Sequence, residues 1–192
     1  MSHFEGSSHS FSIHLSHDEA EILINLVEQL LELLGEGDFF HHYDTTDPLA
    51  QMLAMPLEID IPEDPVLRRL LPSAYADPES ASDFRRYTEP AIRGMKQRTL
   101  RKVREELTGI VDKTEDSGVI DDLDPEIWLL ALNDLRLALA VRLEISAESF
   151  EIFELLPDEN PQKSIYAVYF WLGWLQENLL SLLNSPQGRE TF

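Results

Sequence analysis

The chain has 192 residues, of which 43% are hydrophobic, and a formal net charge of −21. Its length and apolar fraction fit one folded domain with a buried core, and its acidic excess argues against broad affinity for nucleic acids. Because the chain has no cysteine, disulfides, thiolate catalysis, zinc ribbons and thiol-based redox switches are excluded.

The N-terminal part predicts a flexible segment, a short strand and a long helix. Residues 1–10 are rich in Ser and His and are expected to be flexible. Residues 11–15 (FSIHL) alternate apolar and polar side chains, as in a strand. Ser16 and Glu19 have the spacing of a capping box, and the helix that they begin is expected to end at about Leu34, before Gly35.

Prolines and capping residues divide the remainder into helices. They are predicted over 48–54, 65–71, 78–86, 90–111, 125–143, 147–155 and 161–184, with a kink or a fresh start at Pro90. A polar linker is expected over 113–122. The predicted fold class is all-α: a single-domain bundle of about six or seven helices over 11–184, with one short N-terminal strand as an option and a tail over 185–192.

The chain begins with no cationic or apolar leader. Its longest apolar run, over 165–175, is shorter than the ~20 residues that span a bilayer. We therefore expect a cytoplasmic protein with no membrane contact.

Positive charge is concentrated between Arg85 and Arg104. Eight of the fifteen Lys and Arg residues lie there with one acid, Glu89, so the segment sums to 8 − 1 = +7. An amphipathic helix would place one basic arc opposite an apolar arc that includes Ile92 and Met95. The basic arc is either a solvated face or a docking surface for phosphate or an acidic partner. Its members are Arg93, Arg98, Arg101, Lys102 and Arg104.

The helix predicted over 125–143 is apolar on nearly all sides, which is typical of a central, buried helix. Its polar residues must then have partners, because a buried charge has to be paired. We expect Asn133, Asp134 and Arg136 to join a structural polar network rather than to act in catalysis, with Arg85 or Arg86 as the partner of Asp134.

Aromatic side chains surround the last predicted helix. Either this helix is enclosed in the core, or part of it forms an interface with a partner or a second copy of the chain. The residues concerned are Tyr166, Tyr169, Phe170, Trp171 and Trp174.

No sequence motif indicates a catalytic, metal or cofactor site. Nucleotide-binding loops, zinc-protease motifs and nucleophile elbows are absent from the sequence. His41 and His42, with Asp44 and Asp47, could bind a metal, but adjacent histidines point apart and a third well-spaced ligand is missing. We therefore expect no enzyme, no metal and no cofactor.

Three stretches resemble the AosR-like family of actinobacteria, long catalogued as a domain of unknown function. They are residues 69–75 (RLLPSAY), 84–89 (FRRYTE) and 132–143 (LNDLRLALAVRL). The resemblance implies a regulator of the oxidative-stress response that acts on transcription by contact with a sigma factor or RNA polymerase. The thiol sensing proposed for some relatives cannot apply here, because this chain has no cysteine.

The resemblance leaves three alternatives open. A homodimer and direct contact with DNA both remain options. The gene neighbourhood of the family offers another function, that of an accessory or adaptor protein in Clp-dependent proteolysis.

Overall fold

The computed structural model describes residues 2–7, 10–35, 61–112 and 116–185. Within these residues, most of the chain is helical and three strands form one antiparallel sheet, ordered β1-β2-β3. The strands are β1 (His3–Ser7), β2 (Ser10–Ser16) and β3 (Ser117–Ile120). The helices are α1 (His17–Leu33), α3 (Pro65–Leu70), α4 (Pro78–Val111), α5 (Pro125–Arg142), α6 (Ser149–Leu155) and α7 (Pro161–Leu183). The all-α prediction is therefore correct for the helices but misses a sheet.

The sheet corrects two expectations about the ends of the helical region. The strand predicted over 11–15 is confirmed as β2, but it pairs on both sides. Residues 3–7, expected to be flexible, form β1, and β3 lies inside the segment expected to be a linker. Alternate β2 side chains, Phe11, Ile13 and Leu15, are buried, so one face of the sheet packs on the core.

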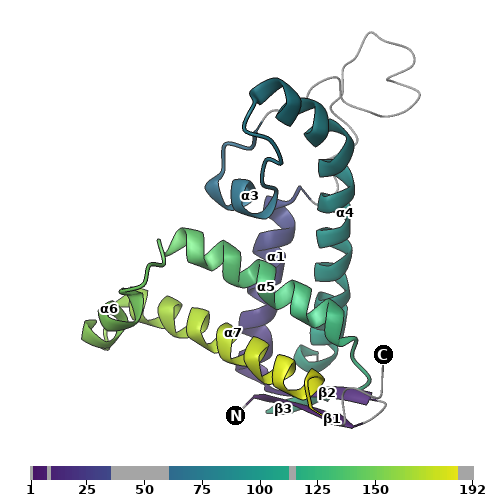
Figure 1. The fold of residues 1–192 in the computed structure, drawn as a ribbon. Helices are drawn as coiled ribbons and strands as arrows, with labels where there is room; N and C mark the ends of the chain where they lie inside the picture. The colour runs from purple at the N-terminus through teal and green to yellow at the C-terminus, as the bar shows by residue number, and fades with distance from the viewer. Residues whose placement is uncertain (1, 8–9, 36–60, 113–115, 186–192) are drawn as a thin grey trace.

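Two long helices and two crossing helices make up the body of the fold. In Figure 1, α1 and α4 run side by side, α5 packs across them, α7 packs against α5, and the sheet lies at one end. Helix α3 packs against α5, while α6 projects to the left of the view. The fully buried Trp128 of α5 lies in the core, and its Nε1 donates to Glu106 of α4 over 2.8 Å.

The helix starts are set by capping residues. The predicted capping box is confirmed: Ser16 Oγ accepts from the Glu19 amide at 3.2 Å, and Glu19 accepts from the Ser16 amide at 2.8 Å. Asp124 caps α5 and Asn160 caps α7. Helix α6 begins at Ser149, two residues later than predicted, after a turn in which Ser146 hydrogen-bonds to Ser149 and Glu148.

Helix α4 is continuous through Pro90, where the sequence predicts a kink or a fresh start. Figure 1 shows that it changes direction near its N-terminal end, as expected where a proline removes one main-chain hydrogen bond. The helix predicted over 48–54 lies outside the described residues. In the part of the chain that the structure covers, no helix is both long and apolar enough to cross a membrane.

Candidate interaction surface

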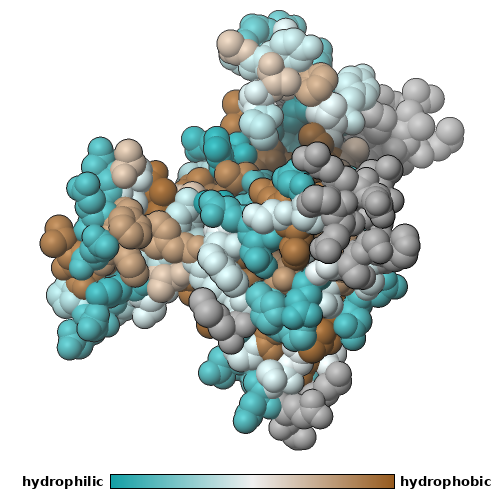
Figure 2. Space-filling model, turned by 60° about the horizontal axis from the view of Figure 1, so that its bottom comes forward, coloured by the Kyte–Doolittle hydropathy of each residue, from teal (hydrophilic) through white to brown (hydrophobic). Residues whose placement is uncertain are grey.

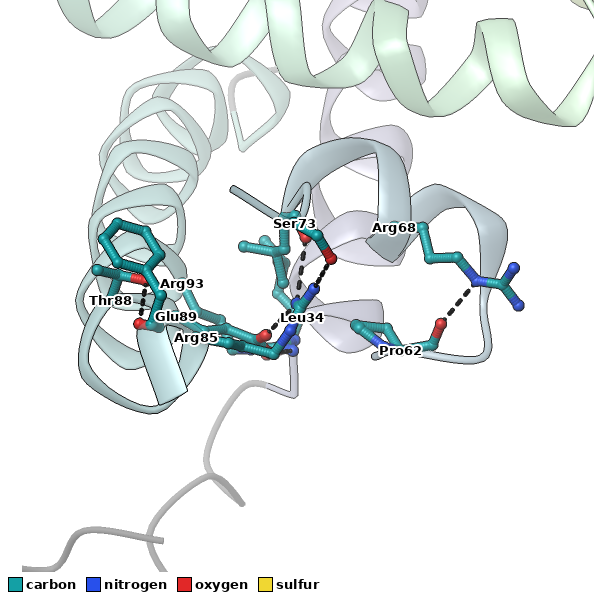
Figure 3. Close-up of polar contacts among 10 residues, drawn as sticks. Leu34, Pro62, Arg68, Ser73, Arg85, Thr88, Glu89 and Arg93 are labelled. Atoms are coloured by element: carbon teal, nitrogen blue, oxygen red, sulfur yellow. Dashed lines mark hydrogen bonds and ion pairs between the residues drawn. The ribbon is translucent and has the colours of Figure 1, made fainter. Parts of the chain in front are cut away.

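The basic segment of α4 is divided between the interior and the surface. Arg85, Glu89 and Arg93 lie at i, i+4 and i+8, and their side chains are 5%, 4% and 6% exposed. Arg85 Nη1 donates to one carboxylate oxygen of Glu89 at 2.6 Å, and Arg93 Nη2 donates to the other at 2.5 Å. One carboxylate therefore holds two buried guanidinium groups (Figure 3).

Both arginines of this buried arginine cluster (Arg85, Glu89 and Arg93) also donate to the C-terminal ends of helices. Arg85 Nη1 also donates to the carbonyl of Leu71, the C-cap of α3, at 3.2 Å. Arg93 Nη1 donates to the carbonyl of Leu34, the C-cap of α1, at 3.4 Å. Because carbonyls at a helix C-terminus carry partial negative charge, they offset the surplus positive charge of the cluster. The cluster is therefore structural.

This arrangement corrects the predicted division of α4 into a basic arc and an apolar arc. Arg93, predicted on the exposed arc, is buried, whereas Ile92 and Met95, predicted on the apolar arc, are 36% and 43% exposed. The prediction assumed that a charged side chain faces solvent. Arg93 is buried instead because Glu89 provides a buried partner of opposite charge. In the remainder of the predicted arc, Arg98 and Lys102 are exposed, and Arg101 and Arg104 are half-buried.

Asp134 has a partner from another helix, as predicted, but not the predicted one. It accepts a hydrogen bond from Lys96 Nζ of α4 at 2.7 Å, not from Arg85 or Arg86. Burial raises the pKa of Asp134, and the hydrogen bond and charge of Lys96 partly oppose that shift. Arg86 is half-buried and lies 5.5 Å from the ring centre of its neighbour Tyr87.

Arg136 also reaches another helix. Its Nη1 donates to Gln176 of α7 at 2.6 Å, and its guanidinium lies 5.3 Å from the ring centre of Tyr169. A Cβ on Gly173 would lie 3.3 Å from this guanidinium, so the absence of a side chain there lets Arg136 cross α7 closely. Asn133 is exposed and hydrogen-bonds to Asp134. The predicted polar network is thus divided into one group around Asp134 and a separate contact of Arg136 with α7.

The aromatic residues of α7 have different environments. Tyr166 is buried, Trp174 is 38% exposed, and Trp171 donates from Nε1 to Ser2 Oγ at 2.8 Å. Tyr169 and Phe170 are half-buried. The ring of Phe170 contacts those of Phe150 and Phe153 in α6, with centroid distances of 5.5 and 5.3 Å. Much of this aromatic face therefore supports α6.

Helix α6 presents apolar side chains to solvent. Phe150, Ile152 and Leu155 are 55%, 46% and 84% exposed, and Figure 2 shows apolar and hydrophilic side chains together on this projecting end. Exposed apolar residues gathered at one place mark interaction sites more often than isolated ones do. Between Arg142 and Lys163 there is no basic residue, and the acidic ones are Glu144, Glu148, Glu151, Glu154, Asp158 and Glu159.

A separate feature of the surface is an apolar hollow. It has a volume of about 510 Å³ and is formed by α1, α5 and the start of α7. Ile22, Leu139, Ile165 and Val168 contribute its apolar wall. We define the α6 end as helix α6 with its flanking acidic residues. The motif at His41 and His42 lies outside the described residues.

Comparison with known proteins places the chain in a family. Residues 1–183 match a family described as a domain of unknown function, DUF2017. The chain belongs to this family.

The resemblance found in the three sequence stretches is thereby confirmed. Relatives of this DUF2017 protein include the oxidative stress regulator AosR of Mycobacterium tuberculosis and that of Mycobacterium bovis. Each is 32% identical over 183 residues, covering 90% of this chain and 82% of the relative. The putative oxidative stress regulator AosR of Mycobacterium leprae is 31% identical over 176 residues, covering 86% and 78%. No solved structure matches this chain.

Proposed function

We propose that this protein is a cytoplasmic regulator of the oxidative-stress response that binds a protein of the transcription machinery, a sigma factor or RNA polymerase, and catalyses no reaction. Two lines support a regulatory role: the names of relatives about one-third identical to the chain, and the three sequence stretches described above. The absence of cysteine means that any signal reaches this protein by contact or by a chemistry other than thiol oxidation.

The α6 end is the observation that carries the proposal. A seven-residue helix with no side-chain N-cap hydrogen bond is a weak element by itself. It keeps three large apolar residues in water, the most exposed being Leu155. Burying a leucine of this kind against a partner gains about 1.5–3 kcal/mol. The α6 end is therefore a described surface that would gain from a protein contact.

The charge around α6 favours a basic partner. Acidic and apolar residues are interspersed along 144–159 with no basic residue between them in the sequence, and Lys163 pairs with Asp158 at the end of this stretch. An apolar centre with a charged rim is typical of protein interfaces. Proteins that contact DNA phosphates carry basic surfaces, and such a surface would be steered toward this acidic rim. A DNA-binding component of the transcription machinery fits that description.

The structure weakens the argument for direct DNA binding through α4. Arg85 and Arg93 are buried, and Lys102 pairs with Glu106 at 3.2 Å. The exposed basic arc is thus smaller than the sequence indicates, in a chain of net charge −21. We therefore assign the main partner contact to the α6 end and treat Arg98 and Lys102 as a secondary contact.

Affinity capture from the native host tests the proposal. The wild type is compared with Leu155→Asp in α6, with Arg98→Glu/Lys102→Glu in α4, and with the control Leu180→Asp. Leu180 is an exposed leucine, 42% exposed. It lies in α7, about 22 Å along the helix from Ile165 near its start. We expect the wild type and the control to retain a sigma factor or RNA polymerase, and Leu155→Asp to lose it.

Two results would decide against the proposal. Failure of the wild type to retain any transcription protein removes it. Retention of a Clp component in place of one would support the adaptor function instead. Loss of the partner in the α4 variant alone would move the contact from α6 to the basic arc.

A further inference from the structure

Two histidines and a glutamate meet on the solvent side of the sheet. His3 of β1 lies opposite His14 of β2 in the strand register, and Glu5 is two residues along β1 from His3. Side chains two apart on a strand share a face, and directly opposed residues are close neighbours. The three are therefore placed together by the pairing of β1 with β2.

Their possible ligand atoms lie close together. His3 Nε2 lies 2.9 Å from Glu5 Oε1, and His14 Nε2 lies 3.4 Å from Glu5 Oε2. The two imidazole rings are parallel, 3° apart, with centroids 4.6 Å apart. One ligand atom from each residue can be chosen so that all lie within 4.8 Å of one another. Ligands of a tetrahedral ion at about 2.0–2.1 Å are roughly 3.3 Å apart. Because an imidazole binds a metal in its ring plane, at least one of the two parallel rings must turn for both Nε2 atoms to reach the same ion.

The strand that supplies two of these ligands is held firmly. The Phe4 amide donates to Asn178 Oδ1 of α7 at 2.8 Å, and Ser2 Oγ accepts from Trp171. Phe4 itself is buried against the core, 3% exposed, beside the ring of Trp128. Ligands on a rigid scaffold bind a metal better than ligands on a loop, because less ordering is needed on binding.

We propose that His3, Glu5 and His14 form a binding site for a divalent transition-metal ion of the zinc class. Both imidazole Nε2 atoms and one carboxylate oxygen bind the ion, and solvent completes the coordination because the three side chains are 42%, 59% and 36% exposed. Imidazole with carboxylate suits Zn²⁺ and its neighbours, whereas Mg²⁺ and Ca²⁺ prefer oxygen ligands alone. The ion would join β1 to β2 and stabilise the N-terminal strand.

Equilibrium titration of the full chain with Zn²⁺ alone tests this site. The wild type is compared with His14→Asn and Glu5→Gln, and with the control His17→Asn. His17 also faces a glutamate, Glu21, at 3.4 Å, but the pair is not part of a three-ligand group among the described residues. A His41→Asn/His42→Asn variant and a His9→Asn variant check the other histidines of the chain.

The expected result is one Zn²⁺ per wild-type chain. Loss of a direct ligand in His14→Asn or Glu5→Gln should weaken binding by at least about tenfold, since loss of an outer hydrogen-bond partner alone costs roughly 10–100-fold. His17→Asn should leave affinity unchanged, and circular dichroism confirms that each variant is folded. Equal affinity in His14→Asn and the wild type overturns the proposal, as does loss of binding only in the His41/His42 variant.

Discussion

Arg93 donates a hydrogen bond to the main-chain carbonyl of Leu34, the C-cap of α1. Arg85 does the same for Leu71 at the end of α3, and Lys163 for Leu156 at the end of α6, at 3.2 and 2.8 Å. Helices α1 and α6 have no basic residue in their own last turn. Cations from other parts of the chain therefore satisfy helix C-termini that lack one locally.

Glu89 is predicted to be essential to the fold although it is the single acid in a basic segment. Replacing it by Gln leaves Arg85 and Arg93 buried without a counter-charge. We expect the free energy of unfolding to fall by about 3–5 kcal/mol, the usual cost of breaking a buried pair. Urea denaturation measures this loss. The control Glu105→Gln, at an exposed position of α4, should change stability by less than about 0.5 kcal/mol; equal effects would contradict the structural role of the cluster.

Lys163 is predicted to hold α6 in place. It donates to Leu156 O and lies 2.6 Å from Asp158, so Lys163→Met removes both contacts while keeping much of the apolar stem. We expect amide hydrogen exchange in α6 to become roughly fivefold faster, corresponding to about 1 kcal/mol of local stability. Lys102→Met, which removes an exposed pair on α4, serves as the control. Unchanged exchange in α6 would show that the aromatic contacts alone hold the helix.

Asp134 is predicted to give an identifiable pH dependence of stability. Burial, partly opposed by Lys96, raises its pKa above the ordinary value of 3.8. The folded chain therefore binds this proton more tightly than the unfolded chain, and the contribution of Asp134 to stability falls as pH rises from 3.8 through the raised pKa. The difference in free energy of unfolding, wild type minus Asp134→Asn, should decrease across that range. A difference that increases with pH would mean that Lys96 outweighs burial.

Substitution by alanine is predicted to change stability in opposite directions at two glycines. A Cβ on Gly118 of β3 would lie 2.8 Å from Cγ1 of Ile110, whereas one on Gly109 of α4 would meet nothing within 4 Å. Gly118→Ala should destabilise by about 1–3 kcal/mol through overpacking. Gly109→Ala should stabilise by up to about 1 kcal/mol because alanine favours the helix. Thermal unfolding of the two variants checks both signs; a stable Gly118→Ala would show that β3 packs more loosely against α4.

Local signals in the sequence predicted the helices well. The capping box at Ser16, the proline starts at Pro125 and Pro161, and the end of α1 at Gly35 each depend on residues next to one another. Gly35 indeed has a positive φ of 73°, which glycine adopts without strain. Strand β1 could not be predicted in the same way, because its stability depends on pairing with β2 and on Asn178, which is 174 residues away from Phe4.

The candidate site was predicted only in part, because burial of charge depends on distant partners. The i, i+4, i+8 spacing of Arg85, Glu89 and Arg93 was a usable signal, but the hydrogen bond to Leu34 spans 59 residues. Lys96 as the partner of Asp134 likewise follows from the packing of α4 on α5. The exposure of Leu155 depends on how α6 projects from the fold, which no local pattern indicates.

The most direct test of the central claim is the affinity of the purified chain for the sigma factor or RNA polymerase retained in the capture experiment. Wild type, Leu155→Asp and Leu180→Asp are titrated under one salt condition. We predict that Leu155→Asp raises Kd at least about tenfold, or 1.4 kcal/mol, while Leu180→Asp leaves Kd within about twofold of the wild type. Equal Kd values for the wild type and Leu155→Asp would contradict the assignment of the α6 end as the partner-binding surface.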